Sequence, residues 1–305
     1  MTLTELRYLV ALAAERHFGH AAERCFVSQP TLSVAIKKFE DELGVALFER
    51  GNNELQLTPI GIRIVQQAER TLAEADRIKD IASEGKDHLS GTLRLGAIYT
   101  IGPYLLPVLA PLLAQRASQL ALVLQENYTD RLLEALRHGE IDVIIIALPH
   151  VESGMVALPL YNEPFRAVVP AGHRWQGESA VQPAWLLDEP LLMLSAGNCF
   201  RDQVLDLCAH ASSGLSGRLP RLLEGSSLET LRRMVSTGMG VTVMPASAAD
   251  PLTGNDPTLA ILPFVAPEPS RRVGLVWRSS FPRHRVIDLL HRAILDCELP
   301  GCTPA

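Results

Sequence analysis

The sequence predicts a mixed α/β protein with a helical N-terminal module, one long helix, and two sets of alternating strands and helices. Three observations lead to this prediction. Apolar residues near the N-terminus recur at helical spacing. From residue 60 to about residue 88 there is no internal proline, and an apolar residue recurs every three or four positions. Beyond residue 90, nearly continuous apolar runs alternate with helical stretches, which is typical of a parallel α/β sheet.

Composition narrows the class of protein. Hydrophobic residues make up 47% and charged residues 20% of the 305 residues, as in ordinary globular proteins. The N-terminus has no basic segment followed by an apolar core, and the longest apolar runs are interrupted by Pro107, Pro111 and Asp142. We therefore expect a cytoplasmic protein with no membrane partner. The net charge of −6 argues against general coating of nucleic acid but permits a local DNA site.

Three short helices are predicted between residues 2 and 44. Thr2 and Glu5 have the spacing of a capping box, which opens the first helix. Ser28 is suited to cap the third helix, with Pro30 in its first turn, and Gly44 is suited to end it.

The third helix has an apolar face and a polar face. A tight turn at Phe26-Val27 precedes it, so the pair of helices predicts a helix-turn-helix. Alternating segments at 45–50 and 54–58 predict a hairpin, and hence a wing. The alternative is a small core with a solvated polar face, because residues 1–58 are not basic overall. The candidate DNA-binding residues are Ser28, Gln29, Pro30, Thr31, Ser33, Lys37, Lys38 and Arg50.

The long helix is predicted to start at Thr58-Pro59, where Thr58 can act as the cap. Its narrow apolar seam favours a coiled-coil-like partner helix, and two copies could then read two DNA half-sites. Packing of the seam against the helix's own domain is the alternative. The seam consists of Ile64, Ala68, Leu72, Ala75, Ile78 and Ala82.

The strands and helices beyond residue 90 divide into two lobes, and a strand at 273–277 returns to the first one. Ligands in such folds bind beyond the carboxyl ends of the strands. Thr100, Thr129 and the segment 198–202 each follow a predicted strand. Convergence of these strand ends would bring two hydroxyls close to a thiol, although a lone threonine is more often a cap or turn residue.

Two of the five cysteines, Cys199 and Cys208, are nine residues apart. On one α-helix their Cα atoms would be roughly 13 Å apart, since the rise is about 1.5 Å per residue. A disulfide needs about 5.5–6 Å. The pair therefore either never bonds or bonds only when the intervening segment refolds. We interpret Cys25, Cys297 and Cys302 as small apolar residues.

The surroundings of Cys199 predict a reactive thiol. Arg201 and Asp202 follow it closely, and a helix is predicted to start there. A helix N-terminus and a nearby cation both lower the pKa of a thiol. Oxidation by peroxide would give a sulfenic acid, which could condense with Cys208.

The N-terminal module resembles the winged helix-turn-helix of LysR-type transcriptional regulators. The matching segments are 21–24, 27–33, 40–50 and 57–61. The resemblance implies a DNA-binding domain at 1–58, a dimerisation helix at 59–89 and an effector domain at 90–305. It further implies a two-lobed, periplasmic-binding-protein-like α/β effector domain, with lobe I at about 90–163 and 265–305 and lobe II at about 164–264. A homotetramer, as a dimer of dimers, is also implied.

The C-terminal part is similar to the hydrogen peroxide-sensing members of that family. Segments 197–203, 227–232 and 240–245, together with Cys208, have this similarity. The resemblance implies a peroxidatic Cys199 and a resolving Cys208. It also implies a peroxide site formed by Thr100, Thr129, Asn198, Asp202 and Arg271. In that family a histidine usually precedes the peroxidatic cysteine, whereas this chain has Asn198.

We therefore expect a peroxide-sensing transcriptional regulator rather than an enzyme. One alternative is a regulator of the same family that responds to a metabolite in the cleft between the lobes. Another is a thiol peroxidase, in which the winged module would have no role. No nucleotide-binding glycine motif or metal-ligand cluster is evident, so we expect no cofactor or metal. The expected partners are promoter DNA, hydrogen peroxide and further copies of the chain, with RNA polymerase as a further candidate.

Overall fold

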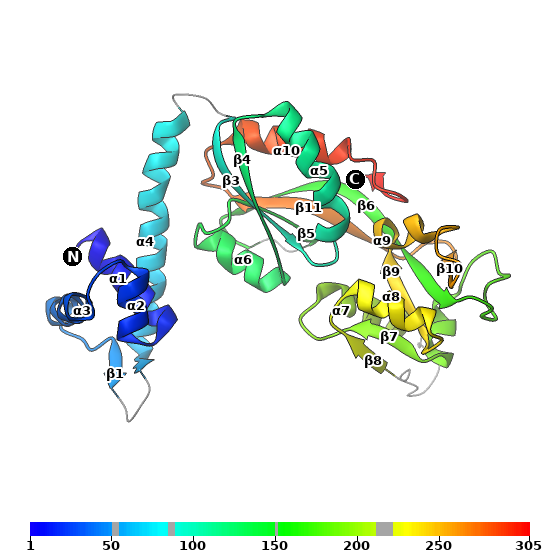
Figure 1. The fold of residues 1–305 in the computed structure, drawn as a ribbon, viewed down its shortest axis with the longest axis horizontal. Helices are drawn as coiled ribbons and strands as arrows, with labels where there is room; N and C mark the ends of the chain where they lie inside the picture. The colour runs from blue at the N-terminus through cyan, green and yellow to red at the C-terminus, as the bar shows by residue number, and fades with distance from the viewer. Residues whose placement is uncertain (51–54, 85–88, 150–151, 212–221) are drawn as a thin grey trace. The chain divides into compact units, whose positions relative to one another are not determined.

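The structure is a computed structural model that describes residues 1–50, 55–84, 89–149, 152–211 and 222–305 (Figure 1). It divides into two compact units, residues 1–86 and, for the most part, residues 87–305. Each unit has its own hydrophobic core. Within the described residues, no helix is both long and apolar enough to cross a membrane.

The first unit contains the predicted three helices, a hairpin and the long helix. The caps are as expected: both bonds of the Thr2–Glu5 capping box form, Ser28 accepts from the Thr31 amide, and Gly44 ends its helix at a φ of +68°. The hairpin strands pair antiparallel, while its predicted turn at 51–53 lies outside the described residues. The elements are α1 (Leu3–Glu15), α2 (Phe18–Arg24), α3 (Gln29–Leu43), β1 (Phe48–Arg50), β2 (Leu55–Leu57) and α4 (Pro59–Glu84).

The junction between the hairpin and α4 depends on Thr58 and Gly61. The Thr58 hydroxyl donates to the carbonyl of Ala46 at 2.9 Å and accepts from the Gly61 amide at 2.9 Å. A Cβ at Gly61 would lie 2.2 Å from the carbonyl oxygen of Leu47. Only glycine therefore permits this close approach of helix and hairpin.

The predicted seam of α4 has two different environments. Ala68 is buried, and Ile64 and Leu72 pack with it against the core of α1, α2 and α3. These residues therefore pack against the helix's own unit, which was the alternative, and a partner helix along the rest of the seam stays a prediction. Ile78, by contrast, is 69% exposed. The side chain of Ala82 and residues 85–88 lie outside the described part of the chain.

The second unit contains two lobes, as predicted from its alternating pattern. Lobe I contains β3 (Gly91–Ile98), α5 (Gly102–Arg116), β4 (Leu120–Asn127), α6 (Thr129–Arg137), β5 (Val143–Leu148), α10 (His284–Leu295) and β12 (Thr303–Pro304). Lobe II contains η1 (Pro183–Asp188), β7 (Leu191–Leu194), α7 (Cys199–Ala211), β8 (Leu222–Gly225), α8 (Leu228–Ser236), β9 (Val241–Pro245), α9 (Ala246–Ala249), η2 (Asp250–Leu252) and β10 (Leu259–Pro263).

Two long strands, β6 (Met155–Pro170) and β11 (Ser270–Arg278), connect the lobes. β6 pairs with β11 up to Pro164 and with β9 and β10 beyond it (Figure 1). The strand order is β4-β3-β5-β11-β6-β9-β7-β8. β3, β4 and β5 pair in parallel, as do β7, β8 and β9, whereas β6 and β11 are antiparallel to their neighbours. The expected parallel sheet is therefore correct within each lobe and wrong for the connecting strands.

Gly61→Ala tests the hairpin–helix junction. We expect a loss of roughly 1–3 kcal/mol in the unfolding free energy of the first unit, because the added methyl group overlaps a backbone oxygen that cannot move freely. Denaturant unfolding followed by circular dichroism measures this loss.

Gly177→Ala is the matched control. A Cβ at Gly177 has no heavy atom within 4 Å, so this variant should unfold like the wild type. Equal stability of the two variants would contradict the close-approach explanation for Gly61.

Candidate functional site

The predicted strand ends converge on one small pocket in the second unit. Thr100 lies just beyond β3, Thr129 is the first residue of α6 after β4, and Cys199 is the first residue of α7. Because β3 and β4 are parallel neighbours, their carboxyl ends meet at one edge of the sheet. The pocket is lined by Ile98, Tyr99, Thr100, Asn127, Tyr128, Thr129, Gly197, Asn198, Cys199 and Phe200.

The pocket is close to the size of one small molecule. The cavity volume is about 10 Å³, which leaves room for about one water molecule. An organic metabolite with several carbon atoms would require the walls to move apart. The arrangement therefore favours a ligand of very few atoms.

Cys199 and Cys208 lie in different environments along the same helix. All five cysteines are free thiols. The half-buried Cys199 packs against the core of lobe I, whereas Cys208 is part of the core of lobe II. Burial raises the pKa of the Cys208 thiol to about 11. Since α7 is continuous from Cys199 to Ala211, the predicted separation of the two thiols by nine helical residues is confirmed.

Thr100 is held by a buried ion pair. Arg271 donates to the Thr100 hydroxyl oxygen at 2.7 Å and to its carbonyl oxygen at 2.9 Å. Nε of the same guanidinium donates to Glu163 at 2.8 Å, and both charged side chains are fully buried. Because the Thr100 oxygen already accepts from a cation, its own proton is available to donate into the pocket.

Arg271 stays charged despite its burial. Burial alone would lower the pKa of the guanidinium, but the Glu163 carboxylate, through its charge and its hydrogen bond, raises it above its ordinary value. The guanidinium also lies 5.3 Å from the ring centroid of Phe200, the residue next to Cys199. Arg271 therefore acts behind the pocket wall, through Thr100 and Phe200, rather than as a lining residue.

Thr129 has a hydroxyl group without a protein partner. Its Oγ1 is buried, and within the described residues no donor or acceptor reaches it. Leaving such a group unpaired costs about 1–3 kcal/mol. An unpaired hydroxyl that lines a pocket with a thiol indicates a place for a polar ligand.

The polar neighbours of Cys199 in sequence have different positions. Asn198 is buried in the pocket wall, and its Nδ2 donates to the Ser195 carbonyl at 3.0 Å. Asp202 is exposed and does not line the pocket. Arg201 points away, to Glu224 at 2.6 Å and the Leu194 carbonyl at 3.0 Å. The cation behind the pocket wall is thus Arg271, which the family resemblance implied, and Arg201 is bound elsewhere.

Three residues at the site were not expected from the sequence, namely Glu163, Tyr99 and Tyr128. Glu163 is fully buried and also accepts from the Ser247 amide at 3.1 Å, so it joins both lobes to Arg271. Its one sequence signal was a carboxylate within the largely apolar strand β6. The signal for the two tyrosines was the repeated Tyr-Thr dipeptide after β3 and β4.

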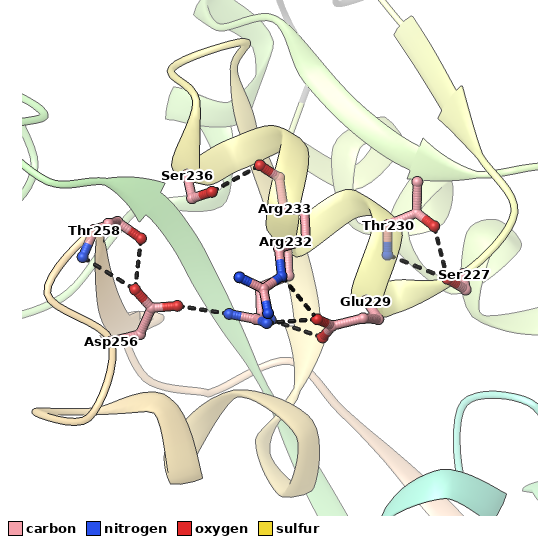
Figure 2. Close-up of polar contacts among 8 residues, drawn as sticks. All are labelled: Ser227, Glu229, Thr230, Arg232, Arg233, Ser236, Asp256 and Thr258. Atoms are coloured by element: carbon pink, nitrogen blue, oxygen red, sulfur yellow. Dashed lines mark hydrogen bonds and ion pairs between the residues drawn. The ribbon is translucent and has the colours of Figure 1, made fainter.

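The polar cluster on α8 stabilises lobe II and lies apart from the pocket. Figure 2 shows Arg232 between Glu229 and Asp256, with hydrogen bonds of 2.7 Å and 2.6 Å. Ser227 caps the helix by accepting from the Thr230 amide at 3.1 Å. The segment 227–232 therefore connects α8 to the loop before β10.

In the first unit, α3 presents most of the candidate DNA-binding residues. Ser28 and Thr31 also take part in the cap, with 2.8 Å between their hydroxyl oxygens. The Arg50 side chain lies outside the described part. Ser33 is half-buried, and the exposed candidates are Ser28, Gln29, Pro30, Thr31, Lys37 and Lys38.

Curated relatives align with nearly the whole chain. A curated relative from Escherichia coli K12, the "DNA-binding transcriptional dual regulator OxyR", is 41% identical over 96% of this chain and 95% of its own. The "Hydrogen peroxide-inducible genes activator" of Haemophilus influenzae is 37% identical over 97% of each.

Solved structures agree in fold. A full-length OxyR variant from Pseudomonas aeruginosa has a TM-score of 0.80 and 48% identity, and the match covers 99% of this chain and 98% of that one. An H2O2-bound OxyR mutant from Corynebacterium glutamicum has a TM-score of 0.66 and 34% identity, with coverage of 97% and 92%.

Two family models together match most of the chain. Residues 3–62 match the bacterial regulatory helix-turn-helix protein of the lysR family, and residues 86–296 match the LysR substrate binding domain. The chain therefore belongs to the LysR family of bacterial regulatory helix-turn-helix proteins.

Proposed function

We propose that this chain is a DNA-binding transcriptional regulator that senses hydrogen peroxide through Cys199 and a reversible Cys199–Cys208 disulfide. The observation that carries the proposal is the pocket itself. It combines a half-buried thiol at a helix N-terminus with the unpaired Thr129 hydroxyl, in a space of about one water molecule. The same small volume argues against a metabolite as the effector.

The first step is oxidation of Cys199. The thiolate sulfur attacks one oxygen of hydrogen peroxide, so that an S–O bond forms and the O–O bond breaks. Sulfur loses two electrons, the leaving hydroxide takes up a proton, and the products are a sulfenic acid and water. Cys199 is the first residue of α7, and the buried cation Arg271 lies behind the adjacent Phe200. Thr100 offers its proton to the peroxide, and Thr129 supplies the second hydrogen bond.

The second step joins Cys199 to Cys208. The Cys208 sulfur attacks the sulfenic sulfur, so that an S–S bond forms, the S–O bond breaks and a second water is released. Helix geometry keeps the Cα atoms roughly 13 Å apart, so α7 must unwind before this bond can form. Unwinding also removes Cys208 from the apolar core of lobe II, where burial keeps the thiol protonated.

Asn198, Asp202 and Arg271 have different proposed roles. Asn198 holds the pocket wall through Ser195 and transfers no proton, because a carboxamide does not titrate near neutral pH. Arg271 orients Thr100. Asp202 is exposed in the first turn of α7, three residues after Cys199, where its carboxylate can approach the sulfenic acid along the same helix face.

The output is a change in DNA binding. We assign residues 1–58 to DNA binding, 59–89 to dimerisation and 90–305 to sensing. The exposed face of α3 supplies short polar groups for base edges and two lysines for phosphates. Two such helices in a dimer read two half-sites, and pairs of dimers extend the contact. Refolding of α7 alters the effector domain and thereby the spacing of the DNA-binding modules.

Cys208→Ser separates the two chemical steps. We expect peroxide to convert Cys199 to a sulfenic acid in this variant, because the pocket is unchanged, but no intramolecular disulfide can follow. Trapping with a sulfenic acid reagent and peptide mass spectrometry measure both outcomes.

Cys25→Ser is the control for general thiol effects. Cys25 lies at the end of α2 in the first unit, so this variant should form the 199–208 disulfide normally. Peroxide should change the operator footprint of Cys25→Ser but not that of Cys208→Ser. Failure of the wild type to yield a linked 199–208 peptide would refute the mechanism.

Thr129→Val should change stability and reactivity in opposite directions. Removal of an unpaired buried hydroxyl should leave the unfolding free energy equal or raise it by about 1 kcal/mol. Loss of a hydrogen bond to peroxide should slow Cys199 oxidation by about tenfold, which corresponds to roughly 1.4 kcal/mol. Thermal unfolding and the rate of sulfenic acid formation are the two measurements.

Thr242→Val is the matched control. The buried Thr242 hydroxyl donates to the Leu192 carbonyl at 2.7 Å, so its removal should lower stability and leave the oxidation rate unchanged. Equal oxidation rates for Thr129→Val and the wild type would exclude Thr129 from the peroxide site.

Because the pKa of the Cys208 thiol is raised, we expect this thiol to react slowly with alkylating reagents and the protein to lose stability at alkaline pH. At pH 7 an alkylating reagent should modify Cys199 well before Cys208, which is buried and protonated. The folded protein binds the Cys208 proton more tightly than the unfolded chain does. This contribution to stability is therefore complete below about pH 9 and is lost as the pH rises to about 11.

Unfolding free energies measured from pH 8 to 11 test the alkaline effect. Cys208→Ala should show a smaller alkaline decline than the wild type, since Cys297 and Cys302 also have raised pKa values and contribute to both proteins. Identical pH profiles would contradict the assignment.

A further inference from the structure

The entrance of the Cys199 pocket is bordered by two tyrosines. Each of the parallel strands β3 and β4 is followed by Tyr-Thr, namely Tyr99-Thr100 and Tyr128-Thr129. Both threonines are buried, with exposures of 3% and 5%. Tyr99 is 40% exposed and Tyr128 is half-buried, so the two rings form the solvent side of the pocket.

The two rings contact each other. Their centroids are 5.3 Å apart and their planes meet at 78°, an edge-to-face arrangement. Such a pair contributes about 0.5–1.5 kcal/mol beyond the burial of area. The two rings therefore stabilise each other's positions at the solvent-exposed side of the pocket, which is its entrance.

Gly197 also lines the pocket and lies close to the Tyr128 ring. Its φ is +93°, and a Cβ built there would lie 3.7 Å from two atoms of the Tyr128 ring. Tyr128, from lobe I, therefore contacts the backbone two residues before Cys199, in lobe II. The tyrosine pair and Gly197 are therefore neighbours in the lining of the pocket that contains the thiol.

We propose that Tyr99 and Tyr128 are specificity-determining residues that select hydrogen peroxide over alkyl hydroperoxides by size. This inference rests on the proposed function of Cys199 as a peroxide-reactive thiol. With either oxidant, sulfur attacks the terminal oxygen, an S–O bond forms and the O–O bond breaks. The leaving group takes up a proton and departs as water or as an alcohol.

The two oxidants differ only in the group on the second oxygen. Hydrogen peroxide carries a hydrogen there, which the small pocket accommodates. An alkyl hydroperoxide carries its alkyl group there, and a cavity of about 10 Å³ leaves it no room inside. The alkyl group would have to occupy the entrance, where the two rings and Gly197 already lie.

The test compares two oxidants in a Cys208→Ser background, where oxidation stops at the Cys199 sulfenic acid. The measured quantity is the ratio of second-order rate constants for hydrogen peroxide and tert-butyl hydroperoxide. The proteins are full-length chains with Tyr99 and Tyr128 intact, with Tyr128→Ala, with Tyr99→Ala, and with both alanines. Circular dichroism melting curves verify that each variant is folded.

We expect the intact pair to favour hydrogen peroxide strongly, and each alanine variant to reduce the ratio by about tenfold, the scale of discrimination by pocket size. Tyr128→Phe and Tyr99→Phe are the matched controls. They keep the rings and should keep the ratio of the intact pair. Loss of selectivity in the phenylalanine variants would assign the effect to the hydroxyls and overturn a filter based on size.

The remaining outcomes distinguish the filter from the proposed function. If hydrogen peroxide does not oxidise Cys199 in the parent, the sensing function itself fails. If it does, but the parent lacks selectivity or the alanine variants keep the parent's ratio, the filter is wrong and the sensing function stands.

Discussion

The buried ion pair between Arg271 and Glu163 is the interaction on which the geometry of the site depends. It connects four separate segments: β11, β6, the Thr100 turn of lobe I and the Ser247 amide of α9 in lobe II. Both charges are fully buried, so removal of one partner would leave the other uncompensated at a cost of about 3–5 kcal/mol. The pair also directs the Thr100 hydroxyl toward the pocket, and places a cation behind Phe200 and Cys199.

A second constraint acts on α7. Cys199 packs against the core of lobe I, whereas Phe200, Val204 and Cys208 belong to the core of lobe II. The helix therefore fixes the two thiols in separate apolar environments while the chain is reduced. A disulfide between them requires loss of helical hydrogen bonds and exposure of buried side chains. The chemistry of Cys199 is thereby coupled to the packing of a whole lobe, as a switch requires.

Local rules predicted much of the fold. The Thr2–Glu5 capping box, the Ser28 cap and the Gly44 terminus all occur at the expected residues, because caps depend on hydrogen bonds within one turn of helix. The packing partner of the apolar seam of α4 was not determined by a local rule. An apolar stripe shows that a helix packs against something, but does not distinguish another copy from the helix's own unit, where Ala68 is in fact buried. The antiparallel connection by β6 and β11 likewise depends on partners far apart in the chain.

The sequence by itself determined the order of the elements, the resemblance to a family, the pair Cys199 and Cys208, and their separation along a helix. These follow from covalent spacing and short-range periodicity, which a single chain displays directly. The family resemblance implied Arg271 at the site, but only the tertiary structure showed that Glu163 holds it and that Arg201 points away. It also decided that the Thr129 hydroxyl is unpaired within the described residues and that two tyrosines border the entrance. These features arise where residues about thirty to one hundred and seventy positions apart meet, and such contacts are selected by packing and burial rather than by local pattern.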